Sequence, residues 1–306
     1  MILMIFFVVS FQGILVVGAF QASRAGVLGA LGAVLVYRRN AQNRWEIVES
    51  LPRPDNLTPT TFGNFGKDVA IGLDQTIYVG APSQINEAGQ QVGALYVYKL
   101  VGNQWPLPTD PLSEGAAGDE FGWSVAVDDD GSLVVGARRA AAVSQESGGV
   151  SRAGVVYEYD IETDGSIKLT QTLDARANAV EGGEYGYSVD LNNFQGTNND
   201  YLVVGQRNPL GVGSIYIYKW SRLTSPDGHI FSFQGSFKKG GIEGRFGTAV
   251  AVDDANLLAG APREDVGIIR DAGVVYPQNL QGTNTITTEP DARIPPKSTD
   301  IPTFSP

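Results

Sequence analysis

Gly32-Ala-Val-Leu-Val-Tyr37 is the first of five related stretches whose recurrence decides the fold of this chain. The other four are Gly93-Ala-Leu-Tyr-Val-Tyr98, Gly154-Val-Val-Tyr-Glu-Tyr159, Gly213-Ser-Ile-Tyr-Ile-Tyr218 and Gly273-Val-Val-Tyr276. Their first glycines are 61, 61, 59 and 60 residues apart in the 306-residue sequence. A regular period of this length, made of short apolar runs, is typical of an architecture of stacked β units.

Two further runs precede each of these stretches, and a fourth often follows. Immediately upstream lies a run that ends in Gly-Ala or a close variant: Leu15-Val-Val-Gly-Ala19, Ile77-Tyr-Val-Gly-Ala-Pro82, Leu133-Val-Val-Gly-Ala137, Leu202-Val-Val-Gly205 and Leu257-Leu-Ala-Gly-Ala-Pro262. Farther upstream, in four copies, an aromatic-Gly pair opens an alternating run: Phe65-Gly66, Phe121-Gly122, Tyr185-Gly186 and Phe246-Gly247. The following run often carries tryptophan, as in Trp45-Glu-Ile-Val-Glu-Ser-Leu51. Each copy therefore predicts four short strands separated by turns.

Four-stranded antiparallel units that repeat around an axis are the blades of a β-propeller. The five copies therefore predict an all-β fold with five visible blades. Glycine has a physical role at two places in each blade. After the aromatic residue it lets the backbone pass close to the centre, and in the Gly-Ala pair it avoids a Cβ that would crowd the neighbouring blade.

The aromatic-Gly start and the Gly-Ala-Pro end of the copies resemble the FG-GAP repeat, the blade unit of the integrin alpha-chain N-terminal β-propeller. The resemblance covers roughly residues 5–280. It implies an extracellular or cell-surface module for adhesion or recognition, in the setting of a membrane-associated glycoprotein with a signal sequence. Integrin-type propellers have seven blades, so the five copies form either a five-bladed ring or part of a seven-bladed one.

The two ends of the chain differ in composition from the repeats between them. Residues 1–17 are strongly apolar, which fits a signal peptide or short anchor, but they also align with the first two strands of a blade. Residues 281–306 hold five prolines and no apolar periodicity, which predicts an extended tail or stalk. We therefore divide the chain into a propeller, residues 1–280, and a Pro/Thr-rich tail, residues 281–306, with no transmembrane helix evident.

Charge and composition narrow the class of partner. The net charge of −11 disfavours nucleic acid, which leaves a protein or an acidic glycan as the expected partner. The absence of cysteine permits an extracellular protein without disulfides but does not require one. Asn56-Leu57-Thr58 is a candidate glycosylation sequon.

A calcium site is the weaker of two explanations for one loop. Repeats of the FG-GAP family often carry an acidic Ca²⁺ loop between the aromatic-Gly and Gly-Ala-Pro strands. The interval is short in most copies here, and only the fourth keeps a longer loop, with Asp190, Asn192 and Asp200 as potential ligands. Phe194 stands where a third ligand belongs. We expect an ordinary polar loop and no cofactor.

The sequence offers little catalytic chemistry. The single histidine, His229, lies in a turn-rich insert, and the chain has no cysteine, which excludes Cys-His nucleophiles and His-based zinc clusters. Acids precede the aromatic-Gly pair in three copies, at Glu120, Glu184 and Glu243. Because they recur, we expect an architectural role for them, and we expect no catalytic residues and no enzyme activity.

Arginines mark the loops that vary most between copies. They follow the Gly-Ala runs closely, at Arg24, Arg138, Arg139, Arg207 and Arg263. In the integrin family the corresponding loops face the ligand, and arginine suits bidentate binding of carboxylate or sulfate. The alternative is local ion pairing with nearby acids, a kind of contact that contributes little to stability: Glu146, Glu264, Asp265 and Asp271.

The sequence therefore predicts a non-enzymatic recognition or adhesion module that binds through loops on one face. Two alternatives stay open. One is a propeller enzyme acting on glycans with an acidic site at the channel mouth, since glycosidases use carboxylate pairs. The other is a passive scaffold within a larger surface protein. A pair of acids that faces the channel and does not recur between copies would favour the enzyme.

Overall fold

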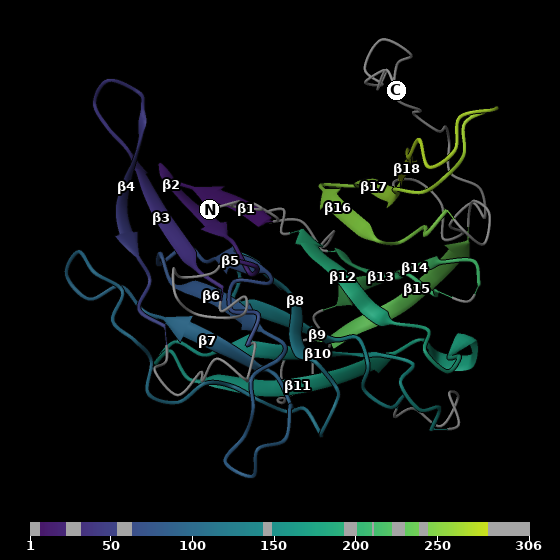
Figure 1. Ribbon diagram of the computed structural model, residues 1–306, viewed down its shortest axis with the longest axis horizontal. Coiled ribbons are helices and arrows are strands. Elements are labelled where there is room, and N and C mark those ends of the chain that lie inside the picture. Colours follow the sequence, from purple (N-terminus) through teal and green to yellow (C-terminus); the bar gives the residue numbers. More distant parts are fainter. Residues whose placement is uncertain are drawn as a thin grey trace.

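A computed structural model describes residues 7–22, 32–53, 63–142, 149–192, 201–209, 211–221, 230–238 and 244–280. Within these ranges the chain forms five antiparallel sheets and one short 3-10 turn, η1 (Arg176–Asn178), with no α-helix. The sheets follow one another around the molecule in chain order (Figure 1). The predicted all-β class with four-stranded antiparallel units is confirmed, and the arrangement is consistent with a propeller.

Three of the sheets have four strands. The first contains β1 (Phe7–Phe11), β2 (Ile14–Gly18), β3 (Val34–Arg39) and β4 (Trp45–Ser50). The third contains β8 (Phe121–Val127), β9 (Ser132–Ala137), β10 (Val155–Ile161) and β11 (Ile167–Asp174). The fourth contains β12 (Tyr185–Asn192), β13 (Tyr201–Gln206), β14 (Ser214–Ser221) and β15 (Ile230–Lys238).

The second and fifth sheets have three strands each among the described residues. The second contains β5 (Val69–Ile71), β6 (Ile77–Ala81) and β7 (Ala94–Tyr98), and the fifth contains β16 (Ala249–Asp253), β17 (Asn256–Ala261) and β18 (Val274–Asn279). In every sheet the strands pair antiparallel in chain order, as in a meander. The aromatic-Gly run forms or precedes the first strand in sheets two to five, the Gly-Ala run forms the second, and the Tyr-x-Tyr run forms the third.

The second sheet departs from the expected four strands. Residues 101–112 follow β7 in the chain but pair with it by only one bridge, between Leu95 and Leu112. The segment contains Pro106, Pro108 and Pro111, which have no N–H to donate to a ladder. Trp105 is nevertheless fully buried, and its Nε1 donates to the carbonyl oxygen of Gln75 at 2.8 Å.

The N-terminal apolar run supplies strands to the first sheet: β1 pairs with β2, with Val9 opposite Val16. Several residues singled out in the sequence lie outside the described ranges: Arg24, Asn56, Asp200, His229, Glu243 and the tail 281–306. Among the residues that are described, no helix is long and apolar enough to cross a membrane.

Each core cluster forms between two neighbouring sheets. One face of a sheet packs against the opposite face of the next, as when Val16 and Val34 of the first sheet meet Val79 and Tyr96 of the second. The same arrangement recurs at the second-to-third, third-to-fourth and fourth-to-fifth junctions. The core is therefore a series of similar interfaces between sheets.

Glycines set how closely the sheets approach. A Cβ on the glycine of a Gly-Ala run would lie closer than 3.0 Å to the carbonyl oxygen of the aromatic-Gly glycine in the next sheet. The pairs are Gly18 with Gly66, Gly80 with Gly122, Gly136 with Gly186, and Gly205 with Gly247. These distances are shorter than any real Cβ contact, so the expected crowding at this position is confirmed.

We predict that substitution by alanine changes the free energy of unfolding very differently at two glycines that occupy equivalent positions of the repeat. In Gly205→Ala the new methyl group meets the carbonyl of Gly247, which we expect to lower the free energy of unfolding by about 3 kcal/mol. In Gly260→Ala the new Cβ meets its nearest atom, the Cβ of Ala249, at 3.5 Å, so the change should stay within about 0.5 kcal/mol. Urea unfolding of both variants measures the difference, and equal destabilisation would contradict this account of the junctions.

Candidate binding site

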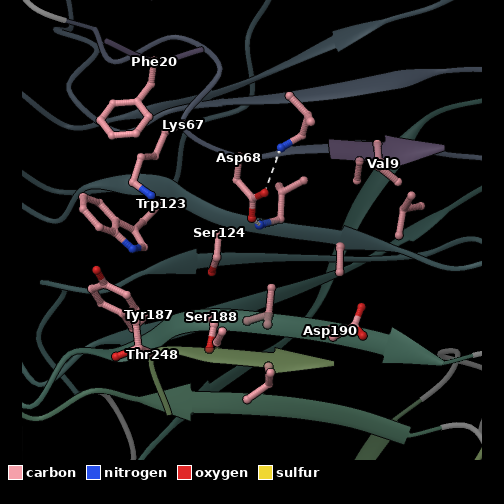
Figure 2. A pocket seen from close by; sticks show the side chains of 18 of the residues that line it. Val9, Phe20, Lys67, Asp68, Trp123, Ser124, Tyr187, Ser188, Asp190 and Thr248 are labelled. Carbon is pink, nitrogen blue, oxygen red and sulfur yellow. Dashed lines mark hydrogen bonds between the residues drawn. The ribbon is translucent and has the colours of Figure 1, made fainter. Parts of the chain in front are cut away.

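The first strands of all five sheets line one central cavity of about 620 Å³ (Figure 2). The residue after each aromatic-Gly pair occupies the same repeat position, and these residues gather with Phe20 at one end: Lys67, Trp123, Tyr187 and Thr248. Val9 and Asp190 lie toward the other end, with Asp68, Ser124 and Ser188 between (Figure 2). The cavity is thus aromatic and cationic at one end and contains carboxylates farther in.

Two of the lining residues are acids that do not recur. Where Asp68 stands, the other copies have Ser124, Ser188 and Ala249. Asp68 accepts the N–H of Val125 in β8 at 2.8 Å and that of Val69 at 2.9 Å. Asp190 accepts the N–H of Val252 in β16 at 2.7 Å. Each carboxylate therefore connects its own strand to the first strand of the next sheet.

Burial shifts the proton affinity of the charged groups in this cavity. It raises the pKa of Asp190 to about 6 against the opposing effect of its backbone hydrogen bonds. It also raises the pKa of Asp68 above its usual range, although the bond from Val125 and the neighbouring Lys67 act in the opposite sense. Burial lowers the pKa of Lys67, which Asp68 partly offsets.

Cations contact the aromatic rings at the cavity end. The guanidinium carbon of Arg138 lies 3.3 Å from the centre of the Trp123 ring, and Nζ of Lys67 lies 4.2 Å from it. The guanidinium carbon of Arg207 lies 4.5 Å from the Tyr187 ring centre. A ring face attracts such a cation, which also fixes the direction of the side chain.

The arginines join two glutamates in a buried ion network. Glu120 pairs with Arg138 at 2.5 Å and with Arg139 at 3.0 Å. Glu184 pairs with Arg138 at 3.0 Å and with Arg207 at 2.6 Å. Arg138 thus connects the third sheet to the fourth. Both glutamates and Arg138 are buried, whereas the side chain of Arg139 keeps 38% of its surface exposed.

The local backbone explains how the glutamates reach this position. The residue before each aromatic-Gly pair has a positive φ, which is 60° for Glu120 and 55° for Glu184, and the glycine after the aromatic residue also has one. The register of the first strand against the second shifts at the same place in the third and fourth sheets. This irregularity places the acid near the loop that follows the Gly-Ala strand, where the arginines lie.

A second hollow of about 510 Å³ borders the network and shares Arg139, Glu184 and Arg207 with it. Three arginines line it, with two glutamates and two other residues: Arg139, Arg152, Arg207, Glu181, Glu184, Gly182 and Pro209. They come from loops of the third and fourth sheets. Three guanidinium groups face two carboxylates at this hollow, the arginine pocket, so an excess of positive charge is available to bind a carboxylate or sulfate group.

Only some of the arginines singled out in the sequence come together. Arg138, Arg139 and Arg207 share the network, whereas Arg263 is exposed in the loop after β17, where its N–H donates to the carbonyl of Gly244. Arg24 lies outside the described residues. The sequence analysis did not single out Arg152, which lines the arginine pocket, or the aromatic residues Trp123 and Tyr187, whose rings contact the arginines. Their signal was present, because Trp123 and Tyr187 occupy one position of the repeat.

The proposed calcium ligands make other bonds in the described part of the chain. Asp190 binds the N–H of Val252, and the side-chain amide of Asn192 donates to the carbonyl of Asp254 at 2.5 Å. Asp200 is not among the described residues. Within them there is no group of three or more acidic or histidine side chains placed to hold a metal ion.

Comparison with known proteins identifies the repeat. Residues 112–152, which include the aromatic-Gly and Gly-Ala strands of the third sheet, match the FG-GAP repeat family model. The resemblance of the chain to FG-GAP repeats is therefore confirmed in this segment. No curated protein sequence is similar enough to count as a match.

Two solved structures are similar in fold. A protein from Lactobacillus plantarum superimposes with a TM-score of 0.54 and 10% identity, over 97% of this chain and 70% of that one. A candidate 6-phosphogluconolactonase from Bacteroides uniformis gives a TM-score of 0.47 and 11% identity, over 94% of this chain and 87% of that one. The similarity to the first structure shows a shared fold alone, and the second structure is too distant to support any inference.

We predict that Asp190 makes stability depend on pH. Its pKa is about 6 in the folded chain against 3.8 for an ordinary aspartate, so folding retains a proton that the unfolded chain releases. The free energy of unfolding should therefore fall as the pH rises from about 4 to about 6, by about 2 kcal/mol from this group.

In Asp190→Asn the free energy of unfolding should not show this part of the fall with pH. Urea unfolding of the variant and the wild type at half-unit pH steps measures the difference. Glu87→Gln, which changes an exposed acid, is the matched control and should follow the wild-type curve. If Asp190→Asn and the wild type declined in parallel, burial of the Asp190 carboxyl would not be the cause.

Proposed function

We propose that this chain is a non-enzymatic recognition or adhesion module that binds an anionic partner in the arginine pocket. The observation that carries the proposal is the set of three guanidinium groups, those of Arg139, Arg152 and Arg207, around one hollow in an acidic protein. The group that the arginines bind on the partner is a carboxylate or a sulfate. Either an acidic glycan or an acidic protein segment supplies such a group.

The geometry favours binding because two of the three arginines, Arg139 and Arg207, are held in place before any ligand arrives. Glu184 fixes Arg207 and Glu120 fixes Arg139, while the Tyr187 ring lies against Arg207. A side chain that is already ordered loses less conformational entropy on binding. The arginines are positively charged, whereas the protein as a whole has a net charge of −11. The electrostatic potential at the pocket therefore differs from that of its surroundings.

We also propose the setting in which this module works. We propose an extracellular or cell-surface location, which the FG-GAP resemblance favours, and the Pro/Thr-rich composition of residues 281–306 fits a stalk. The architecture that we propose is a β-propeller in which the five sheets are blades, either of a five-bladed ring or of part of a seven-bladed one.

A second candidate function has one observation in its favour. Asp68 and Asp190 are acids that do not recur between copies, they line the same cavity, and both have raised pKa values. A carboxyl that stays protonated near neutral pH suits a general acid, so a glycan-active enzyme remains the alternative. Their bonds to the amides of Val125 and Val252 argue for the structural role, because those oxygens already have partners.

Anionic probes test the recognition proposal. We expect a sulfated heparin-type octasaccharide or a Glu-rich peptide to bind the purified chain, with affinity that falls as salt is raised. Arg152→Gln should weaken that binding roughly tenfold, the size of one lost charge-assisted contact. Calorimetry gives the affinity, and the two probes distinguish a glycan from a protein ligand.

Arg263→Gln is the matched control, since it removes the same charge from an exposed loop outside the pocket and should leave the affinity unchanged. Equal weakening by both variants would point to a diffuse electrostatic effect. Binding of neither probe would leave the passive scaffold or the enzyme. Turnover of a glycoside panel that is lost in Asp68→Asn and Asp190→Asn would establish the enzyme.

A further inference from the structure

The fifth sheet presents an apolar face to solvent. Across its three strands the side chains on this face lie in register, because Ala249 is opposite Gly260, Ala251 is opposite Leu258, and Gly260 is opposite Val275. Leu258 is 44% exposed and Val275 is 39% exposed. Ala249 and Ala251 are also exposed. The face is therefore continuous, apolar and open.

The same face is covered in the other four sheets. The positions equivalent to Leu258 are all at most 3% exposed: Val16, Tyr78, Val134 and Val203. The positions equivalent to Val275 are all fully buried: Val34, Leu95, Val156 and Ile215. In each case the covering side chains belong to the next sheet, beginning with its aromatic-Gly residue, as Phe246 covers Ile215.

The glycines of the fifth sheet repeat this pattern. Gly260 and Gly273 occupy the positions at which Gly205 and Gly213 meet the backbone of Gly247 and Phe246 in the next sheet. Among the described residues, the atoms nearest to a Cβ at Gly260 or Gly273 belong to the fifth sheet or its own loop, at 3.3 Å or more. Both glycines leave room for a backbone that the described chain does not place there.

We propose that this face, composed of Ala249, Ala251, Leu258, Gly260 and Val275, is a docking surface for a further blade of the same repeat class. The occupant's first strand opens with an aromatic-Gly pair, whose glycine carbonyl lies against Gly260 as that of Gly247 lies against Gly205. The molecule already forms this interface four times, once at each junction between neighbouring sheets.

The first sheet does not fill this role in the described structure. Neighbouring sheets pack through several strands, whereas no strand pair between the first and fifth sheets makes a comparable contact among the described residues. Leu15, Leu35 and Tyr37, on the opposite side of the first sheet, remain partly exposed. The exposed face of the fifth sheet, which is buried at every internal junction, is therefore not covered by the first sheet in the described residues.

Thiol labelling measures whether a blade covers the face. The chain has no cysteine, so Ala251→Cys supplies a single reporter on the face, and Ile268→Cys supplies one in a loop that is fully exposed. The full chain is compared with an extended chain that carries a copy of residues 181–238 joined after Pro306. We expect labelling at position 251 to slow at least tenfold in the extended chain, with no change at position 268.

Two controls separate docking of the added blade from other causes of slow labelling. The extended chain with Gly186→Val in the added copy should restore fast labelling, because its aromatic-Gly strand can no longer approach Gly260. A synthetic peptide of residues 183–192 added to the unextended chain gives a measurement that does not require the added copy to fold. It should slow labelling at position 251 in proportion to its concentration.

Fast labelling at position 251 with both the added copy and the peptide would overturn the proposal. Protection of position 251 that grows with the concentration of the unextended chain alone would also overturn it, because the occupant would then be a second copy. Neither result depends on the arginine pocket, so the test is independent of the proposed binding function.

Discussion

The close approach of a glycine in one sheet to a carbonyl oxygen in the next is the constraint on which the molecule depends. Four such pairs occur, from Gly18 with Gly66 to Gly205 with Gly247. Any Cβ at these positions would separate the sheets by pushing on backbone, which cannot rotate away as a side chain can. The spacing of the sheets, and hence the width of the central cavity, follows from the absence of these side chains.

The same junctions position the ion network. Two left-handed residues flank the aromatic residue that opens the first strand, and the one that precedes it is Glu120 in the third sheet and Glu184 in the fourth. Burying a carboxylate is costly unless it is paired, and each of these two contacts two guanidinium groups. Three arginines share two glutamates, so the network keeps positive charge at its edge, where Arg139 and Arg207 border the arginine pocket.

The period of the sequence predicted the strands well, because a strand depends on local alternation and turns that every copy repeats. It failed for the fourth strand of the second sheet, where three prolines between residues 106 and 111 remove the donors that a ladder needs. The site was harder to predict. Arg138 pairs with Glu120 and Glu184, which lie 18 and 46 residues away in sequence, whereas local ion pairing would have used acids in the arginine loops. Similarly, Asp190 resembled a loop ligand, but the strand register directs its carboxylate to Val252 in the next sheet.

Comparison of the copies with one another explains why the network occupies one side of the molecule. The residue before the aromatic-Gly pair and the residue after Gly-Ala change together. The pairs are Asn64 with Pro82, Glu120 with Arg138, Glu184 with Arg207, and Arg245 with Pro262. Where the residue before the aromatic-Gly pair is not an acid, the residue after Gly-Ala is proline. Where the first is glutamate, the second is arginine. A feature that every sheet shares fits an architectural role, whereas this paired departure occurs in two adjacent sheets only. The arginine pocket is lined by loops of these two sheets, so any ligand bound there occupies one junction and not the central cavity.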